Sequence, residues 1–222
     1  MGNNSEKYFL DWAEGLIGKI INKEKDSHGD EGLIYGIETK NAKYFLKIKF
    51  ESTSTKESDK LKWFQGKIPV PEVVGFITNN NSKALLMTAI QGKNLAVLSK
   101  VWSAEKVVDK LVDALHKLHS IEIGDWPYDS NDYHKVMVHG DACLSNFIFN
   151  NDGLSGYIDL GDAKIDNPEV DLSAAIWSLQ YNLGKGYGVQ FLEKYGYLNP
   201  TEEIVEKLRL EYENYQRAHG FL

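Results

Sequence analysis

Two short segments in the second half of the sequence hold polar residues whose types and spacing could support catalysis. The sequence H-G-D-A-C-L-S-N occupies positions 139–146, and I-D-L-G occupies positions 158–161. A carboxylate in a loop, such as that of Asp141, can accept the proton of a hydroxyl group. Asn146 and Asp159 offer the hard oxygen ligands that Mg²⁺ prefers. These residues therefore predict metal-assisted chemistry at a hydroxyl group.

The order of the two motifs resembles the H-R-D, downstream Asn and D-F-G pattern of protein kinases. The motifs H-G-D-A-C-L-x-N and S-G-x-I-D-L-G are similar to those of the aminoglycoside phosphotransferases, especially their 3′-phosphotransferase branch. Gly161-Asp162-Ala163, Asn167-Pro168 and Asp171-Leu172 continue this resemblance. A chance constellation is the alternative for one motif, but two motifs in this order and spacing argue against chance.

The resemblance implies a role for each of these residues. Asp141 is expected to be the catalytic base, and Asn146 and Asp159 are expected to bind Mg²⁺ beside the phosphates of ATP. Asp171 is expected to brace the catalytic loop. Cys143 has no evident base partner, so we expect it to pack in the core rather than act as a nucleophile.

The first half of the sequence adds a possible lysine–glutamate pair. Lys47 lies among apolar residues in Tyr44-Phe45-Leu46-Lys47-Ile48, and Glu57 follows ten residues later. Either residue alone would be interpreted as a solvated surface charge. By resemblance, Lys47 binds phosphate and Glu57 pairs with it. Trp63 and the segment 66–71, G-K-I-P-V-P, extend the match.

Two further segments are predicted to bind the nucleotide. By resemblance, the backbone groups of Thr88 and Ile90 bind the adenine edge. The Gly-rich turn at residues 27–32 is predicted to cover the phosphates, through Ser27 or through backbone amides. This turn is not a Walker A loop, because no G-K-[ST] follows it. An ordinary hairpin turn remains the alternative there.

Hydrophobic patterning predicts strands first and helices later. Strands are expected at Leu16–Ile21, Gly32–Thr39, Lys43–Phe50, Val73–Thr78 and Ala84–Thr88, with a helix at Ser54–Gln65. The second half is expected to contain a helix that Ser103 caps and that ends near His119, two strands at Asn146–Asn150 and Ser155–Asp159, and helices at Asp171–Asn182, Tyr187–Tyr195 and Thr201–Arg217.

These elements predict an α+β chain, and the resemblance implies a bilobal, protein-kinase-like fold. A strand-rich N-lobe, residues 1–88, is expected to bind the nucleotide. A helical C-lobe, residues 89–222, is expected to hold the catalytic loop, the metal site and the acceptor site.

Composition excludes several classes of protein. The net charge of −7 argues against a general nucleic-acid binder, whose domains are usually basic. Cys143 is the only cysteine, which rules out an intrachain disulfide and a cysteine metal cluster. No signal-like N-terminus and no membrane-length apolar run is visible. We therefore expect a cytoplasmic protein that acts on a small molecule, without a membrane partner.

The sequence departs from the family pattern at one place. The family usually has several tens of helical residues before H-G-D, and these form part of the acceptor platform, whereas only residues 121–138 separate Ser120 from His139. The leading hypothesis is transfer of the ATP γ-phosphate to a hydroxyl of a small cationic acceptor, an aminoglycoside by resemblance. The alternatives are a kinase-fold enzyme for another small alcohol (a macrolide, sugar or amino alcohol) and a non-catalytic nucleotide-binding module.

Overall fold

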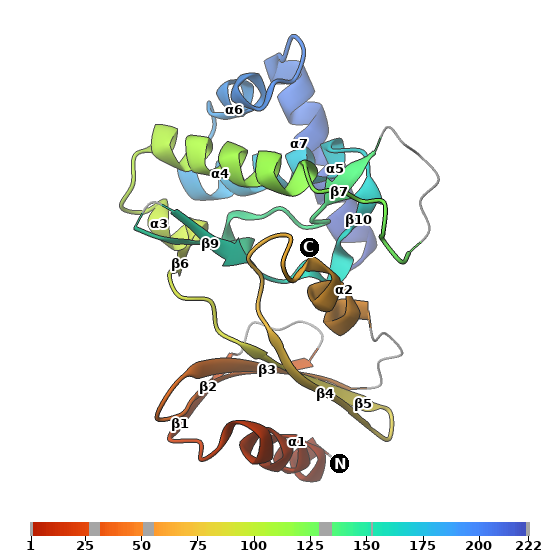
Figure 1. Cartoon of the computed structure of the whole chain (residues 1–222). Helices are drawn as coiled ribbons and strands as arrows, with labels where there is room; N and C mark the ends of the chain where they lie inside the picture. The colour runs from red at the N-terminus through yellow and green to blue at the C-terminus, as the bar shows by residue number, and fades with distance from the viewer. Residues whose placement is uncertain (1, 27–31, 51–55, 129–134, 152, 221–222) are drawn as a thin grey trace. The chain divides into compact units, whose positions relative to one another are not determined.

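A computed structural model of the chain describes residues 2–26, 32–50, 56–128, 135–151 and 153–220 (Figure 1). The chain divides into two compact units. One comprises residues 1–65 and 70–90, and the other comprises residues 66–69 and 91–222. None of the described helices combines the length and the apolar character that a membrane span requires.

The first unit is built on a five-stranded sheet in the order β1-β2-β3-β5-β4, in which all neighbours are antiparallel. Its elements are α1 (Gly2–Ile17), β1 (Asn22–Asp26), β2 (Gly32–Glu38), β3 (Lys43–Lys49), α2 (Lys56–Phe64), β4 (Val73–Asn79) and β5 (Ser82–Thr88). The four predicted strands between residues 32 and 88 are confirmed as β2 to β5. The predicted helix before Gly66 is confirmed as α2.

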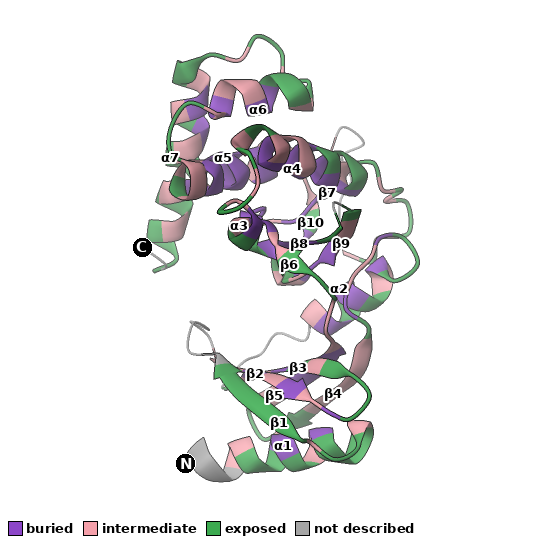
Figure 2. Cartoon of the chain, turned by 90° about the vertical axis from the view of Figure 1, so that its left-hand side faces the viewer, coloured by how far each residue is buried: buried purple, intermediate pink, exposed green. Residues whose placement is uncertain are grey.

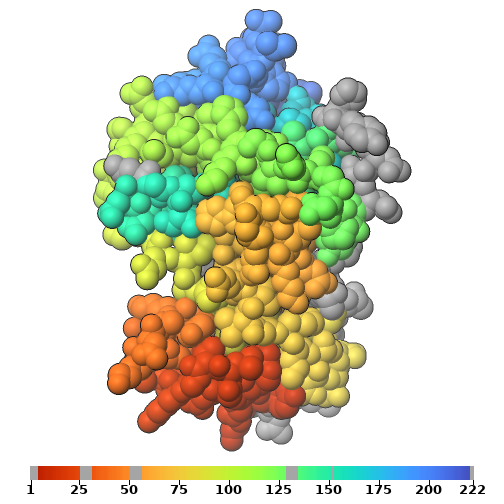
Figure 3. Space-filling view, viewed as in Figure 1, coloured from red at the N-terminus to blue at the C-terminus, as the bar shows by residue number. Residues whose placement is uncertain are grey.

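The prediction of a strand at Leu16–Ile21 is wrong. Leu16 and Ile17 are the last residues of α1, and the first strand begins only at Asn22. The apolar residues of α1, among them Phe9, Leu10, Ala13 and Ile17, recur at helical spacing, so that one face of the helix is apolar. This face packs on the sheet, in a buried cluster of Phe9, Leu10, Ala13, Tyr35, Ile37, Leu46, Ile48, Ala84 and Leu86. In the space-filling view α1 (red) lies beside the β4–β5 hairpin (yellow) (Figure 3).

The second unit is mainly helical. Its elements are β6 (Lys93–Asn94), α3 (Leu95–Leu98), α4 (Ala104–His119), β7 (Val136–Val138), β8 (Phe147–Asn150), β9 (Gly153–Tyr157), β10 (Lys164–Asp166), α5 (Glu169–Leu183), α6 (Gly188–Tyr195) and α7 (Glu202–Ala218). The strands form two small antiparallel sheets, β10-β7 and β6-β8-β9. The predicted helices are confirmed, whereas α3 and the short strands β6, β7 and β10 were not predicted.

The helix α4 begins where its sequence predicts. The side chain of Ser103 accepts a hydrogen bond from the amide of Lys106 and so caps the first turn. Seven residues of one face are buried: Val107, Val108, Leu111, Val112, Ala114, Leu115 and Leu118. The fully buried Tyr157 donates its hydroxyl to the carbonyl of Ala114 at 2.8 Å, which ties the end of β9 to this helix.

The helix α5 is buried along most of its length. Eight of its fifteen residues are buried, and Figure 2 shows it largely purple, in contrast to the exposed strand β1 of the first unit. A helix that is apolar on most sides belongs in a core rather than on a surface. The buried side chains of α5 include one carboxylate, Asp171, which lies in its first turn.

Replacement of Phe9 tests whether α1 belongs to the core of the first unit. Phe9 is fully buried, so Phe9→Ala is expected to lower the free energy of unfolding by about 3–5 kcal/mol. The neighbouring Tyr8 is 43% exposed, and Tyr8→Ala is expected to cost less than about 1 kcal/mol. Urea unfolding of both variants provides the comparison. Equal, small effects would show that α1 does not stabilise the sheet.

Candidate active site

The H-G-D motif lies in a loop that follows β7, and one buried carboxylate fixes its start. Asp171 Oδ2 accepts a hydrogen bond from the amide of His139 at 2.7 Å, and Oδ1 accepts one from the amide of Gly140 at 2.9 Å. Two consecutive peptide groups are therefore held by one side chain. The prediction that Asp171 braces the loop of the H-G-D motif is confirmed, whereas the catalytic role of this loop remains a prediction.

A second hydrogen-bond network, formed by His119 and Tyr195, supports the carboxylate of Asp171. His119 Nε2 lies 2.9 Å from Asp171 Oδ2, and His119 Nδ1 lies 2.7 Å from the hydroxyl of Tyr195. A carboxylate only accepts hydrogen bonds, so Nε2 of His119 carries the proton on that side. Burial and the charge of Asp171 raise the pKa of Tyr195 to about 12. Fully buried, Asp171 thus receives three N–H donors, which offset the loss of hydration.

The imidazole of His139 links the loop to the second motif. His139 is fully buried, and its Nε2 lies 3.0 Å from the carbonyl oxygen of Ile158. A carbonyl accepts only, so Nε2 donates this bond. The amide of Asp141 donates to Nδ1 of the same ring at 3.4 Å. His139 therefore holds the loop against the residue that precedes Asp159.

Gly140 occupies a position that other residues could not adopt without displacement. Its φ is +88°, in the left-handed region that favours glycine, and a Cβ there would lie 2.5 Å from the carbonyl oxygen of Asp162. The chain can approach the second motif this closely only because position 140 lacks a side chain.

The carboxylate of Asp141 is partly buried and is held through both of its oxygens. Asn146 Nδ2 donates to Oδ2 at 3.0 Å and also to the backbone carbonyl of Asp141 at 2.8 Å. The hydroxyl of Tyr212, from α7, donates to Oδ1 at 2.7 Å. Each oxygen accepts one hydrogen bond and so retains acceptor capacity for a further donor.

The two predicted metal ligands lie close together along the backbone. The amide of Ile158 donates to the carbonyl of Asn146 at 3.0 Å, and Asp159 is the next residue. Asp159 is exposed and adopts φ +60°, ψ +49°, a left-handed conformation that is uncommon for residues other than glycine and is often found at functional sites.

The donor set suits Mg²⁺ better than a metal that needs several charged or nitrogen ligands. Asn146 uses its amide nitrogen for Asp141, and its oxygen accepts a hydrogen bond from the Ser145 hydroxyl at 3.4 Å and keeps a second acceptor position for a metal ion. Asp159 would add one carboxylate. Mg²⁺ is typically held by one or two carboxylates together with substrate phosphates. Within the part of the chain that the structure describes, no three His, Cys, Asp or Glu side chains cluster as a metal site.

In the first unit the structure brings Lys47 and Glu57 together. Lys47 Nζ lies 2.6 Å from Glu57 Oε1, and each side chain is only 15% exposed. Lys47 is in β3, opposite Ile34 of β2 and Leu85 of β5, which fixes its place in the middle of the sheet. The predicted pair therefore exists, whereas its role toward phosphate remains a prediction.

The structure says less about the other residues that were predicted to bind the nucleotide, Ser27, Thr88 and Ile90. Ser27 lies outside the described residues. Thr88 ends β5, and its amide donates to the carbonyl of Glu72 at 3.0 Å, so this amide already has a partner. Ile90 is the last residue of the first unit. The predicted adenine contacts of Thr88 and Ile90 remain predictions.

Cys143 lies within the loop of the H-G-D motif, and Tyr212 of α7 contacts it; the sequence predicted a packing role for Cys143 and nothing for Tyr212. Burial, with the charge of Asp141 as the next cause, raises the pKa of the Cys143 thiol well above its usual range. The thiol is therefore a poor nucleophile, in agreement with its predicted packing role. Tyr212 is 71 positions away from Asp141, and no local pattern connects the two.

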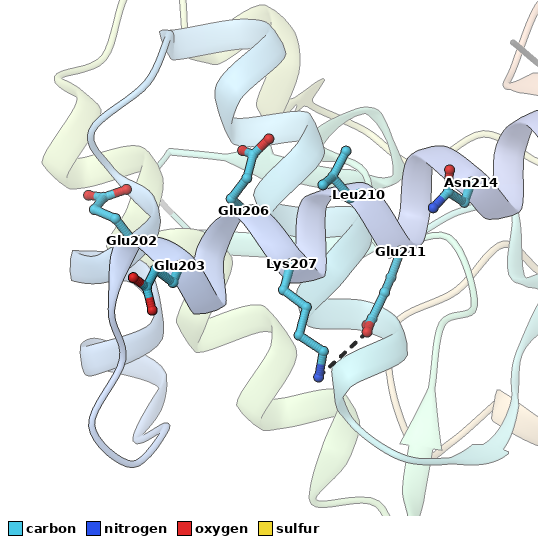
Figure 4. Close-up of a pocket in the computed structure, with 7 residues that line it drawn as sticks. All are labelled: Glu202, Glu203, Glu206, Lys207, Leu210, Glu211 and Asn214. Carbon is cyan, nitrogen blue, oxygen red and sulfur yellow. Dashed lines mark ion pairs between the residues drawn. The ribbon is translucent and has the colours of Figure 1, made fainter.

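One face of α7 is rich in acidic side chains. A shallow depression there is lined by Glu202, Glu203, Glu206, Lys207, Leu210, Glu211 and Asn214 (Figure 4). Glu211 pairs with Lys207, and Glu213 pairs with Arg209 and Arg217. Ion pairs on a helix surface of this kind are common and individually weak, so these acids belong to a solvated face.

The short segment between α4 and the H-G-D motif has little secondary structure. Between the end of α4 at His119 and the start of β7 at Val136, the described residues 120–128 and 135 include no helix or strand. Lys67 Nζ contacts the carboxylate of Asp125 in this segment at 3.0 Å.

Comparison with known proteins agrees with the motifs. The model of the phosphotransferase enzyme family matches residues 124–208. An aminoglycoside 3′-phosphotransferase of Niallia circulans is 26% identical in an alignment of 238 positions that covers 83% of this chain and 90% of that protein. A probable aminoglycoside 3′-phosphotransferase of Lactococcus lactis is 24% identical in an alignment of 214 positions that covers 77% of this chain and 81% of that protein.

Solved structures extend the likeness to the fold. The aminoglycoside-3′-phosphotransferase of type VIII superposes with a TM-score of 0.71 at 20% identity, over 93% of this chain and 98% of that one. The aminoglycoside phosphotransferase APH(3″)-Id from Streptomyces rimosus, in complex with ADP and streptomycin, gives a TM-score of 0.73 at 17% identity, over 95% and 98%. The predicted α+β, protein-kinase-like fold is confirmed. The chain is therefore similar in sequence to aminoglycoside 3′-phosphotransferases, and its fold is similar to that of solved aminoglycoside phosphotransferases.

Proposed function

We propose that this protein is an ATP-dependent phosphotransferase that moves the γ-phosphate to a hydroxyl group of a small cationic acceptor, with an aminoglycoside as the leading class. The observation that carries the proposal is the carboxylate of Asp141. It stands in a loop fixed by Asp171, and both of its oxygens are oriented by neighbouring donors.

In the proposed reaction, Asp141 orients the acceptor hydroxyl and receives its proton. The hydroxyl oxygen forms a bond to the γ-phosphorus, while the bond from this phosphorus to the bridging oxygen of ADP breaks. A base fixed in one rotamer holds the hydroxyl in position for attack, and positioning supplies most of the catalysis in phosphoryl transfer. Partial exposure leaves the Asp141 carboxylate accessible to a substrate.

Asn146 and Asp159 are the residues that we assign to Mg²⁺. The chemistry that a bound Mg²⁺ supplies is the neutralisation of negative charge on the phosphate oxygens. Because the amide nitrogen of Asn146 also holds Asp141, this one side chain connects the metal site to the base. A change at Asn146 is therefore expected to affect both.

The nucleotide end of the reaction is assigned to the first unit. Lys47, held by Glu57, is proposed to bind phosphate oxygens. Backbone groups of Thr88 and Ile90 are proposed to bind adenine, and Ser27 to cover the phosphates. ADP is bound by one of the structural relatives, which supports ATP as the donor here.

The acceptor class rests on the relatives and on charge. The relatives are named as aminoglycoside phosphotransferases, and one of them is complexed with streptomycin. In this chain Asp141, Asp159 and Asp162 place negative charge around the catalytic loop, which favours a cationic acceptor.

Other small alcohols remain the second candidate because residues 121–135 are few for a full acceptor platform. The intact set of Lys47, Asp141, Asn146 and Asp159 argues against a non-catalytic module.

Asp141→Asn tests the base. The amide cannot accept the proton, so kcat is expected to fall by at least ~10²-fold while nucleotide affinity stays nearly constant. The matched control is Asp113→Asn, since Asp113 is exposed on α4 and lies outside the loop. Turnover by coupled ADP release and nucleotide affinity by calorimetry are the measurements. Near-normal turnover of the Asp141 variant would show that another group is the base.

Asp159→Asn tests the metal site. Asparagine tolerates the left-handed backbone at this position, so the change removes the charge with little strain. Nucleotide binding that depends on Mg²⁺ is expected to weaken by about tenfold or more, together with activity. Asp166→Asn is the control, because Asp166 pairs with lysines instead. Titration of nucleotide with and without Mg²⁺ measures the effect, and an unaltered dependence on Mg²⁺ would contradict the assignment.

The short segment before the catalytic loop predicts weak acceptor binding. Fewer contacts to remote parts of the acceptor lower kcat as well as affinity. We expect a large KM for kanamycin-like acceptors and slow ATP hydrolysis without acceptor. Any preference for amines should fade with added salt, because exposed charges are screened over about 8–10 Å near physiological ionic strength.

The measurement is kcat/KM for kanamycin-like, macrolide and amino-alcohol acceptors at two salt concentrations, beside ATP hydrolysis alone. Efficient, salt-insensitive turnover of an aminoglycoside would show that another element completes the acceptor site.

A further inference from the structure

The C-terminal helix α7 reaches the catalytic loop through a single hydroxyl group. Tyr212 is 6% exposed, and its hydroxyl oxygen lies 2.7 Å from Asp141 Oδ1 and 3.3 Å from Cys143 Sγ. These distances make Tyr212 the contact between α7 and the proposed base.

The direction of each hydrogen bond follows from chemistry. A carboxylate only accepts, so the one proton of the Tyr212 hydroxyl goes to Asp141. The thiol of Cys143 is then the donor to the oxygen of Tyr212. Burial, followed by the neighbouring Cys143 and Asp141, raises the pKa of Tyr212 well above its usual range, so the hydroxyl stays protonated as a donor.

Packing keeps the ring of Tyr212 in place. Its centroid lies 5.6 Å from that of Trp177 in α5, and Trp177 stacks on Tyr181 with centroids 5.5 Å apart and ring planes 8° apart. The hydroxyl of Ser178, also in α5, accepts a hydrogen bond from the amide of Leu144 at 2.9 Å. The ring that holds Asp141 and the loop that bears Asp141 are therefore both attached to α5.

Without Tyr212, Oδ1 of Asp141 would lose its tyrosine donor, and Asn146 and the thiol of Cys143 would be the side chains left beside the carboxylate. Asn146 donates to Oδ2 of Asp141, and the same side chain is proposed to bind the metal ion. It would then have to hold both the carboxylate and the metal ion. A hydrogen bond from a neutral hydroxyl to a carboxylate is shorter and stronger than one between neutral groups. The bond from Tyr212 therefore restricts the rotation of the carboxylate on the side away from Asn146.

We propose that Tyr212 is a positioning residue for Asp141: its hydroxyl, delivered by α7 and clamped by Trp177, sets the rotamer in which the carboxylate meets the acceptor hydroxyl. This inference rests on the proposed function, since it assumes that Asp141 is the base. It differs from a purely structural role, in which the hydroxyl would only satisfy a buried polar group.

Tyr212→Phe is the main test, because it keeps the ring and its packing and removes the hydroxyl. Loss of a charge-assisted hydrogen bond that orients the base is expected to lower kcat by about tenfold or more. The KM values for ATP and for the acceptor are expected to stay within about twofold, because the buried Tyr212 is proposed to act only through Asp141. An unchanged kcat, with or without a loss of stability, would overturn the proposal.

A control variant isolates the hydroxyl of Tyr212. Tyr215→Phe makes the same change on the same helix, at a side chain that is 46% exposed, and should leave kcat unaltered. A loss with Tyr215→Phe as large as that with Tyr212→Phe would overturn the assignment to Tyr212.

A double-mutant cycle in unfolding provides a readout that does not need activity. Urea unfolding of Tyr212→Phe, Asp141→Ala and the double variant should be non-additive, because both changes remove the same contact. Additive effects would overturn the contact itself. If the unmodified protein phosphorylated no acceptor, the proposed function would fail, while the cycle would still decide whether Tyr212 holds Asp141.

Discussion

The candidate active site depends on the buried carboxylate of Asp171. This charge lies at the start of α5 with no exposed surface, and it is balanced by N–H donors from His139, Gly140 and His119. Removing one partner of such a buried charge is costly, because the charge would be left uncompensated. The hydrogen bonds to Asp171 therefore favour one conformation at the start of the H-G-D loop, and this conformation depends on α5.

From this anchor the loop is positioned in steps. His139 connects it to Ile158, Gly140 allows the approach to Asp162, and Asn146 closes the loop back onto Asp141. The first two steps join the H-G-D motif to the I-D-L-G motif and its next residue, and the third lies within the H-G-D motif. The proposed base Asp141 is thus hydrogen-bonded to Asn146, one of the two proposed metal ligands, and such fixed positions suit phosphoryl transfer, in which positioning supplies most of the catalysis.

The parts of the site that the sequence predicted are those with local signals. The spacing of the two motifs predicted Asp141, Asn146 and Asp159, and family resemblance added the Lys47–Glu57 pair, which the structure brings within 2.6 Å. Tyr212 was not predicted, because its contact with Asp141 arises from the packing of α7 on α5. The helix α1 was missed because its last residues, rich in branched apolar side chains, also fit a strand, and only the sheet that they cover selects a helix.

Two aspartates of the same unit show how the surroundings divide structural from chemical roles. A carboxylate has about four acceptor positions. Asp171 uses three of them for N–H donors and is fully buried, so no substrate can reach it. Asp141 receives one side-chain donor on each oxygen and is partly exposed, so it has both the orientation and the remaining capacity to accept a hydrogen bond from a hydroxyl group. The number of donors and the exposure, more than the residue type, separate the supporting role of Asp171 from the catalytic role that we propose for Asp141.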